Sequence, residues 1–382
     1  MFETRAWVLH QGGDDDRPAD LTEETYHVAD LEPREVLVEP IFGCWEANMA
    51  HAIRRRPIDI CRNRRERRVV IGNAGVVRVL AAGADASDLH EGQACLLFCN
   101  GTWDAQGFPE RIFAYDAPGT TGVLARRTKV HRQQLIPLPV RSRFSLQQWA
   151  AFSLRYITAW ANWKVALGCW RLTGGAREGV AADVWGWGGG VAFAELTLAQ
   201  LLGHRATMMA STDDRLAGLA AAGLTAVDRR GFGAMQFDPA RYDIDAAYRQ
   251  EYLAGEETFL RVVDGRTGGA GVSIFVDFIG LPVYRATLKA LSRGGVITTA
   301  GWKAGMHLTT VRAIECMQWH THVHTHYARY ADGVEAVAFA EARGWLPEVG
   351  PVYGWQEIPA LAADYAAGRL ATYFPLFSIN AA

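Results

Sequence analysis

The stretch D-V-W-G-W-G-G-G-V-A-F-A-E-L-T-L-A-Q-L-L-G-H, residues 183–204, decides the fold of this 382-residue chain. It predicts a short buried strand, a glycine cluster and then a helix. Glycines at such a junction let the backbone approach a pyrophosphate closely, and the N–H groups at the helix start stabilise its negative charge. Gly186 and Gly188 fill the first two places of the G-x-G-x-x-G fingerprint, whereas Val191 fills the third. The stretch therefore predicts a dinucleotide-binding unit.

The sequence after the glycines continues with alternating strands and helices. An apolar face at helical spacing supports the first helix: Val191, Ala194, Leu198, Leu201 and Leu202. Further strands are expected at 206–210, 272–278 and 295–300, with a helix at 283–292. This alternation predicts a doubly wound parallel sheet. The insert at 229–266, rich in Asp, Arg and Tyr, is interpreted as a helical excursion.

The sequence on either side of this unit predicts a second domain. Residues 1–145 favour β-strands, because stretches such as 35–40 alternate apolar and polar residues with period two. The tail from about Glu335 predicts a helix, a short strand near Val352 and a further helix that packs back on the first domain. We therefore expect an α/β protein with a β-rich domain, residues 1–150 plus 335–382, into which residues 151–334 are inserted.

The end of the second nucleotide-domain strand bears on which dinucleotide binds. An acid there would accept hydrogen bonds from the ribose of NAD and repel the additional phosphate of NADP. Residues 208–215, M-M-A-S-T-D-D-R, place no acid at the strand end. They offer Ser211, Thr212 and, a helical turn later, Arg215. These residues favour NADPH, although the two hydroxyls could serve only to cap the next helix.

Composition excludes several classes of function. The formal net charge of −2 gives no electrostatic case for binding nucleic acid or an anionic membrane. The first residues lack the pattern of a signal peptide, and no apolar run is long enough to span a bilayer. The six cysteines show no disulfide-framework spacing. We expect a cytoplasmic protein with reduced thiols.

The chain resembles the medium-chain dehydrogenase/reductase superfamily over essentially its whole length. The resemblance rests on the mid-chain glycine motif, on Thr158-Ala159-Trp160, on residues 276–280 and on an L-x-x-L-x-x-G-G segment at 288–295. It implies a GroES-like catalytic domain, an inserted Rossmann domain and a homodimer or homotetramer. The implied cofactor-binding residues are Thr158, Gly186, Gly188, Gly189, Gly190, Val191, Ser211, Thr212, Arg215 and Gly280.

The zinc ligands of that superfamily are largely replaced. Cys44 lies near the first ligand position, but the G-H-E site reads Gly72-Asn73-Ala74, and the third position falls near Leu154. A tetrahedral catalytic zinc needs three protein ligands, so we expect no metal. Without a Lewis acid, hydride addition to an activated C=C bond is easier than addition to an isolated carbonyl. Enoyl or quinone-type reduction is therefore expected.

A closer resemblance is to crotonyl-CoA carboxylase/reductases. It rests on residues 223–230 with the insert after them, on 294–299 and on His326-Tyr327-Ala328-Arg329-Tyr330. It implies that His326 lies beside the nicotinamide, with Asn48 or Glu46 opposite as catalytic partner. Where that family has a phenylalanine and an acid after a Gly-Ser, residues 122–125 read G-V-L-A, which argues against carboxylation.

Two further patterns bear on the site. His320, His322, His324 and His326 alternate, so an extended strand would project all four imidazoles from one face. This row is interpreted as a metal site or proton relay, or as a polar strand face at a seam; His324 or His326 is placed near the nicotinamide. Eight arginines lie between Arg54 and Arg68, either a solvated loop or a phosphate-binding surface for a CoA or carrier-protein thioester.

These patterns predict an NADPH-dependent, zinc-independent reductase of a polarised C=C bond in a small-molecule substrate. Three alternatives remain. The first is a zinc-free carbonyl or alcohol dehydrogenase, and the second is a reductive carboxylase of an enoyl-CoA. The third is a non-catalytic NADPH-binding scaffold or sensor.

Overall fold

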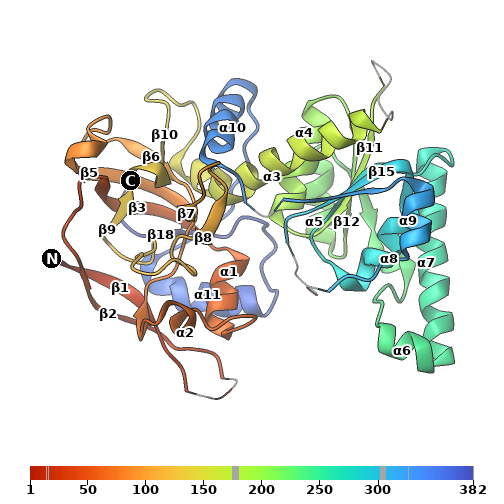
Figure 1. The fold of residues 1–382 in the computed structure, drawn as a ribbon, viewed down its shortest axis with the longest axis horizontal. Coiled ribbons are helices and arrows are strands. Elements are labelled where there is room, and N and C mark those ends of the chain that lie inside the picture. The colour runs from red at the N-terminus through yellow and green to blue at the C-terminus, as the bar shows by residue number, and fades with distance from the viewer. Residues whose placement is uncertain (14, 16, 174–179, 302–306, 326, 382) are drawn as a thin grey trace. The chain divides into compact units, whose positions relative to one another are not determined.

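The computed structural model describes residues 1–13, 15, 17–173, 180–301, 307–325 and 327–381. The chain forms two compact units, one of residues 1–157 with 327–382 and one of residues 158–326 (Figure 1). The first change of unit falls within the helix α3 (Leu146–Leu172), and the second falls directly before Tyr327. The predicted boundaries were 150/151 and 334/335.

The second unit is built on a parallel sheet. In its described part, six strands follow the order β13-β12-β11-β14-β15-β16, and every pairing is parallel. The strands are β11 (Asp183–Trp187), β12 (Arg205–Ala210), β13 (Thr225–Asp228), β14 (Val272–Asp277), β15 (Leu291–Thr299) and β16 (Thr321–His324). The doubly wound parallel sheet predicted from the sequence is confirmed.

Helices cover both faces of this sheet (Figure 1). They are α4 (Gly190–Leu201), α5 (Asp213–Ala221), α6 (Pro239–Ile244), α7 (Ala246–Thr267), α8 (Leu281–Ala290) and α9 (Arg312–Gln318). The helices α6 and α7 occupy the insert, which is helical as predicted. The expected apolar face of α4 is wrong at its end: Leu201 and Leu202 are exposed, because the helix finishes there and the chain turns at Gly203.

The central strand β11 is buried along its whole length because both of its faces are covered. On one face Trp185 and Trp187 join an apolar cluster with Phe259 of α7. On the other face, a Cβ on Gly186 would lie 3.1 Å from Leu196 of α4. The glycine therefore allows α4 to pack close to the strand that leads into its N-terminus.

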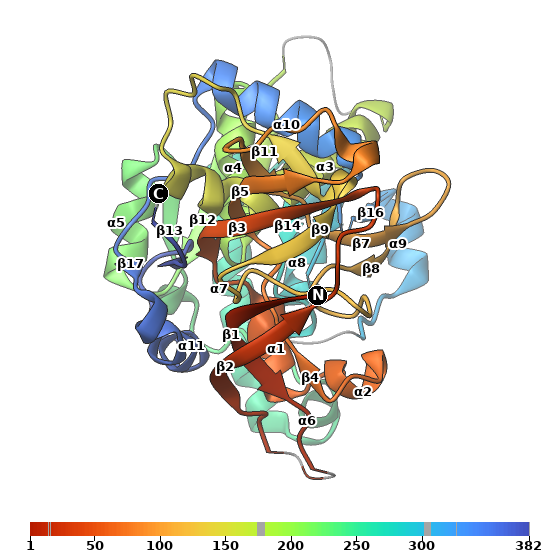
Figure 2. The same cartoon turned by 90° about the vertical axis from the view of Figure 1, so that its left-hand side faces the viewer.

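The first unit consists of β-structure with a few helices, and its described strands pair antiparallel except for β17 with β18, which pair in parallel. In its described part, β1 lies between β2 and β4 in a small sheet, and a larger sheet follows the order β10-β6-β5-β3-β18-β17, with β9 also paired to β3 (Figure 2). Its strands are β1 (Phe2–His10), β2 (Leu21–Val28), β3 (Glu35–Cys44), β4 (Arg68–Val69), β5 (Gly75–Ala82), β6 (Ala94–Leu97), β7 (Asn100–Trp103), β8 (Pro109–Ile112), β9 (Thr128–His131), β10 (Leu135–Pro137), β17 (Val352–Tyr353) and β18 (Leu376–Ser378). The helices are α1 (Ala47–Arg54), α2 (Ile60–Arg64), α10 (Tyr330–Arg343) and α11 (Ile358–Ala366).

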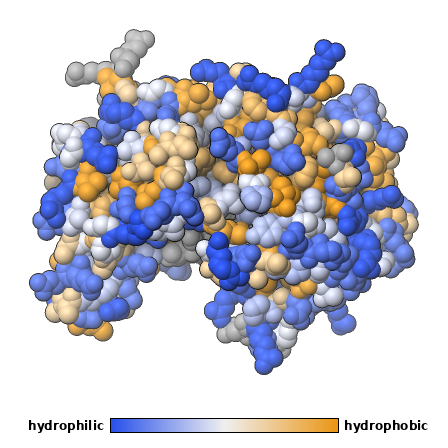
Figure 3. Space-filling model, turned by 180° about the vertical axis from the view of Figure 1, so that it is seen from behind, coloured by the Kyte–Doolittle hydropathy of each residue, from blue (hydrophilic) through white to orange (hydrophobic). Residues whose placement is uncertain are grey.

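The C-terminal segment completes the first unit. Strand β18 pairs antiparallel with β3, and the ring of Phe377 packs edge-on against the fully buried Trp45, with ring centroids 6.2 Å apart. This return of the tail to the β-rich part agrees with the sequence prediction. The two units carry hydrophilic residues interspersed with small apolar patches on the face seen in Figure 3. Among the described helices, none is long and apolar enough to cross a membrane.

Candidate functional site

The glycine turn after β11 leads directly into the N-terminus of α4. Gly188 has φ +138°, a backbone conformation that favours glycine, and a Cβ there would lie 2.7 Å from Cβ of Phe278. Gly189 is the N-cap of α4, and a Cβ at Gly189 would meet nothing within 4 Å. The start of this twelve-residue helix is thus left uncovered at Gly189, and Gly190 forms its first turn. Val191, in the third glycine position, is partly buried on α4.

A serine and an arginine meet at the ends of the neighbouring strands β12 and β13. Arg229 donates a hydrogen bond from Nη2 to Ser211 Oγ at 3.3 Å. The two strands pair in parallel with Ala210 opposite Asp228, so the residues after them lie side by side. Sequence reasoning selected Ser211, Thr212 and Arg215 and missed Arg229. The sequence could have indicated Arg229, because it directly follows a strand, and the carboxyl ends of adjacent parallel strands lie at the same edge of the sheet.

The acids near this edge are held by another arginine. Arg230 forms ion pairs with Asp213 at 2.6 Å and with Asp228 at 2.7 Å. The Arg230 guanidinium lowers the pKa of Asp228 below its usual range by hydrogen bonding. The charge of Arg230 is therefore engaged by two carboxylates, while Arg229 contacts a hydroxyl.

Gly280 lies at the carboxyl end of the next strand, β14. It is the N-cap of α8 and has φ +91°. Asp277 Oδ1 accepts hydrogen bonds from the N–H of Ile279 at 2.8 Å and of Gly280 at 3.1 Å. Burial raises the pKa of Asp277 to about 6, although these two bonds oppose the shift. Because Trp187 and Asp277 pair across the strands, this turn lies beside the glycine turn after β11.

A network of buried polar side chains includes α4, the helix that follows the glycine turn. Asn162 of α3 donates to Glu195 Oε2 of α4 at 2.7 Å and accepts from Thr298 of β15 at 2.5 Å. Glu195 is 0% exposed, and burial raises its pKa to about 8, opposed by the bond from Asn162. These two hydrogen bonds join α3, α4 and β15. Thr158, one turn earlier on α3, is also buried.

In the first unit, a buried arginine contacts both Cys44 and Glu46. Arg155 donates a hydrogen bond to Cys44 Sγ at 2.7 Å and one to the Trp45 carbonyl at 2.7 Å, and its Nη1 lies 2.9 Å from Glu46 Oε1. Burial raises the pKa of the Cys44 thiol to about 12 and of Glu46 to about 7; the guanidinium opposes both shifts. Sequence reasoning placed the third zinc-ligand position near Leu154 and missed Arg155, the next residue.

Several polar atoms of the first unit are buried without a partner in the described part of the chain. They include Trp45 Nε1, Asn48 Oδ1 and both side-chain amide atoms of Asn73, which is 1% exposed. Asn48 forms a side-chain hydrogen bond with the Tyr327 hydroxyl. Because buried polar groups are nearly always hydrogen-bonded, unpartnered atoms indicate where a ligand or water binds. Asn73 and Tyr327 were not selected from the sequence as site residues.

The histidine row is only partly a strand. His326 lies outside the described residues. The strand β16 ends at His324 and begins after His320, whose Nδ1 lies 2.9 Å from Glu315 Oε2. His320 thus lies between the turn at Trp319 and the strand, and the interpretation of the row as a metal site or proton relay stays a prediction. His322 and His324 do share a face, with ring centroids 3.9 Å apart, and burial lowers the pKa of His322 to about 4.

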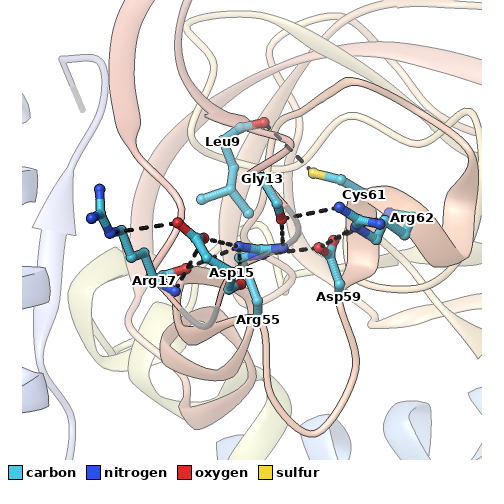
Figure 4. A network of polar contacts seen from close by, with 8 residues as sticks. All are labelled: Leu9, Gly13, Asp15, Arg17, Arg55, Asp59, Cys61 and Arg62. Atoms are coloured by element: carbon cyan, nitrogen blue, oxygen red, sulfur yellow. Dashed lines mark hydrogen bonds and ion pairs between the residues drawn. The ribbon is translucent and has the colours of Figure 1, made fainter.

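In the arginine-rich segment 54–68, α1 ends at Arg54, residues 60–64 form α2 and β4 begins at Arg68. Most of its arginines are exposed, as expected of a solvated segment, whereas the side chains of Arg55 and Arg64 are buried or nearly so. Arg55 is mostly buried; it donates to Asp59 and to the Asp15 carbonyl at 2.9 Å each and also to the Gly13 carbonyl (Figure 4). The Arg64 side chain is 0% exposed and donates to the Thr120 carbonyl at 2.7 Å. Arg55 thus holds the loop at Gly13 and Asp15, and Arg64 holds the loop at Thr120, by hydrogen bonds to their backbone carbonyls.

The described residues contain no group of three or more His, Cys, Asp or Glu side chains that could hold a metal ion. At Cys44, the hydrogen-bonding partner of the sulfur is a guanidinium. The donor set at this position therefore does not fit a tetrahedral zinc.

Comparisons with known proteins place the fold. No family model and no curated protein matches the sequence. The crotonyl-CoA carboxylase/reductase AntE, solved with NADP, matches with TM-score 0.81 at 19% identity over 99% of this chain and 95% of its own. The 2-octenoyl-CoA carboxylase reductase CinF from a Streptomyces, solved with NADP and 2-octenoyl-CoA, matches with TM-score 0.80 at 16% identity over 98% and 87%.

An alcohol dehydrogenase from Pyrobaculum aerophilum matches with TM-score 0.72 at 15% identity over 99% of this chain and 100% of its own. The matches thus extend over the β-rich part and the inserted parallel sheet alike. The chain has the fold of these oxidoreductases, which is the medium-chain dehydrogenase/reductase fold predicted from the sequence.

Proposed function

We propose that the protein is an NADPH-dependent reductase that delivers hydride to a polarised C=C bond without zinc. The observation that carries the proposal is the contact between Arg155 and Cys44. A cation already lies against the only cysteine at a zinc-ligand position of the superfamily, so a metal ion there would meet electrostatic repulsion. A reaction without a Lewis acid is favoured when the developing charge delocalises into a thioester or ketone.

The second unit would hold the cofactor. The turn at Gly186, Gly188 and Gly189 leaves the N-terminus of α4 accessible for a pyrophosphate. Ser211 and Arg229 would bind the 2′-phosphate, with Thr212 and Arg215 beside them. When bound, the reduced nicotinamide supplies a hydride. AntE and CinF, solved with NADP, support the choice of NADPH.

The first unit would orient the substrate and handle protons. The unpartnered amide of Asn73 can donate a hydrogen bond to a carbonyl oxygen that gains negative charge. Glu46, with a pKa of about 7, can hold a proton at neutral pH, and Asn48 fixes the Tyr327 hydroxyl. His326 and His324 are retained as candidates for proton transfer. The acyl-CoA solved in complex with CinF, 2-octenoyl-CoA, supports an enoyl thioester as the substrate class.

Replacing Arg229 by alanine is expected to raise KM for NADPH by tenfold or more, about 1.4 kcal/mol, with little change in KM for NADH. The reason is the loss of the cation beside Ser211. Steady-state kinetics with both cofactors measures the ratio. Arg230→Ala is the matched control, because its guanidinium is already engaged by Asp213 and Asp228. If Arg229→Ala changes KM for NADPH and KM for NADH equally, Arg229 does not bind the 2′-phosphate.

The substrate class is tested by comparing acceptors. The protein with NADPH is incubated with an enoyl thioester and, separately, with a saturated ketone or aldehyde of the same chain length. Consumption of NADPH with the enoyl thioester and not with the saturated carbonyl is expected. The opposite preference would support a carbonyl or alcohol dehydrogenase. Incorporation of carbon into the product that depends on bicarbonate would indicate reductive carboxylation. Tight binding of NADPH without turnover of any acceptor would indicate a scaffold or sensor.

A further inference from the structure

A cavity of about 510 Å³ lies in the second unit, away from the glycine turn. It is formed by the end of α3, by α9 and by the beginning of β16. Its lining includes Thr173, Glu315, Cys316, Trp319 and His320. None of these residues has a part in the function proposed above, so the cavity is a separate feature of the fold.

The way in which α9 ends brings two of these side chains together. Trp319 adopts φ +58°, which is unfavourable for a bulky residue. The N–H of His320 then donates to the Glu315 carbonyl at 3.2 Å, as in a Schellman motif. This turn places His320 Nδ1 2.9 Å from Glu315 Oε2. Backbone strain of this kind persists where the surrounding structure maintains it, often at functional sites.

The other nitrogen of His320 is buried and unused. The His320 side chain is 5% exposed, and its Nε2 has no hydrogen-bond partner among the described residues. A neutral imidazole that donates from Nδ1 to a carboxylate presents Nε2 as a proton acceptor. Since His320 lines the cavity, a group that borders the cavity can give its proton to Nε2 once a small side-chain rotation uncovers this nitrogen.

Cys316 supplies such a group. All six cysteines are described, and Cys316 is the exposed one, whereas Cys44, Cys61, Cys95 and Cys99 are buried. It lines the same cavity as His320. No hydrogen bond joins the Cys316 thiol to His320 Nε2 in this structure, so the exposed cysteine side chain has to rotate towards His320 before its proton can be transferred. A thiol brought next to a histidine that a carboxylate orients is activated as a nucleophile. The described acids, cysteines and histidines do not gather closely enough for a metal centre.

We propose that this cavity is a thiol-modification site at which Cys316 forms a mixed disulfide with a small disulfide, the oxidised form of a low-molecular-weight thiol. His320 Nε2 takes the proton of the Cys316 thiol. The sulfur attacks one sulfur of the small disulfide, whose S–S bond breaks as the new S–S bond forms. The other half leaves as a thiolate and takes up a proton. Cys316 is oxidised and the released thiol is the reduced product.

Charged groups around the cavity are few. Glu315 and His320 line it together with uncharged threonines, and the Arg293 guanidinium lies 5.1 Å from the Trp319 ring centroid. The carboxylate is engaged with His320. His320 is therefore the proton acceptor that this lining offers to the thiol, which makes its replacement the decisive variant.

The full-length reduced protein is incubated with oxidised glutathione at neutral pH and followed by intact-protein mass spectrometry. One glutathionyl adduct, mapped to Cys316, is expected, and Cys316→Ser should form none. His320→Gln should form the adduct at least about tenfold more slowly at neutral pH and approach the wild-type rate at alkaline pH, where solvent removes the proton. Cys169→Ser is the matched control, because this half-buried cysteine should leave the rate unchanged.

Circular dichroism verifies that each variant is folded. If His320→Gln is unfolded, Glu315→Gln becomes the decisive variant in its place. A several-fold slower reaction is expected for Glu315→Gln. The proposal is overturned if the wild type forms no adduct, if another cysteine carries it, or if the decisive variant reacts at the wild-type rate at neutral pH.

Discussion

Replacing Arg155 by methionine is expected to lower the free energy of unfolding of the first unit by about 3–5 kcal/mol. The change removes a buried cation that contacts Cys44, Glu46 and the Trp45 carbonyl. It leaves a buried carboxyl group without its counter-ion and a carbonyl without its donor. Equilibrium urea unfolding measures the loss.

Two further variants test whether the loss of stability comes from the buried charge. Arg369→Met removes a half-exposed pair with Asp364 and should change stability by less than about 1 kcal/mol. Adding Glu46→Leu to Arg155→Met should restore a large part of the loss, because no uncompensated charge then remains. If Arg155→Met alone is as stable as the Arg369 control, Arg155 does not have the structural role assigned to it.

Replacing Glu195 by glutamine is expected to abolish much of the fall in stability between pH 4.5 and about pH 8. Burial raises the pKa of Glu195 from 4.5 to about 8, so the folded state binds a proton that the unfolded state releases. Between these two pH values, stability therefore falls as pH rises, by up to about 1.4 kcal/mol per pH unit. Glutamine keeps the shape and the contact with Asn162 but cannot ionise.

Unfolding of wild type and Glu195→Gln is compared at pH 5 and pH 9. The two proteins should have similar stability at pH 5, and the variant should be more stable by a few kcal/mol at pH 9. Asp277 and Glu46 also have raised pKa values, about 6 and about 7, so some decline should remain in the variant. Parallel pH profiles of the two proteins would contradict the burial of an uncharged Glu195.

The fold was predictable because its signals are local. The glycine turn, the buried strand β11 and the strand–helix alternation each occupy a few consecutive residues, and the parallel sheet follows from them. The ends of the elements were predicted less accurately. For example, β15 begins at Leu291, four residues before the start of the expected strand at 295–300. Tertiary packing, which periodicity does not report, decides such ends.

The site was predictable only where residues are close in sequence. Ser211 follows its strand directly, but Arg229, which contacts it, is 18 residues away and follows the next strand, β13. Arg155 contacts Cys44 across 111 residues, and no local pattern announces this pair. The alternation of the histidines does not show that the chain turns at Trp319 or that the strand begins only at Thr321. The predicted oligomer and cytoplasmic location stay predictions.

The central claim, hydride transfer from NADPH to a C=C bond, is tested most directly with NADPH that carries deuterium at C4 of the nicotinamide. The protein is incubated with each C4 epimer and an enoyl thioester in a solution treated with a chelator. We predict that one epimer transfers deuterium to the β-carbon of the saturated product at the rate seen without chelator. Absence of deuterium from the product with both epimers, or activity that depends on added zinc, would contradict the account.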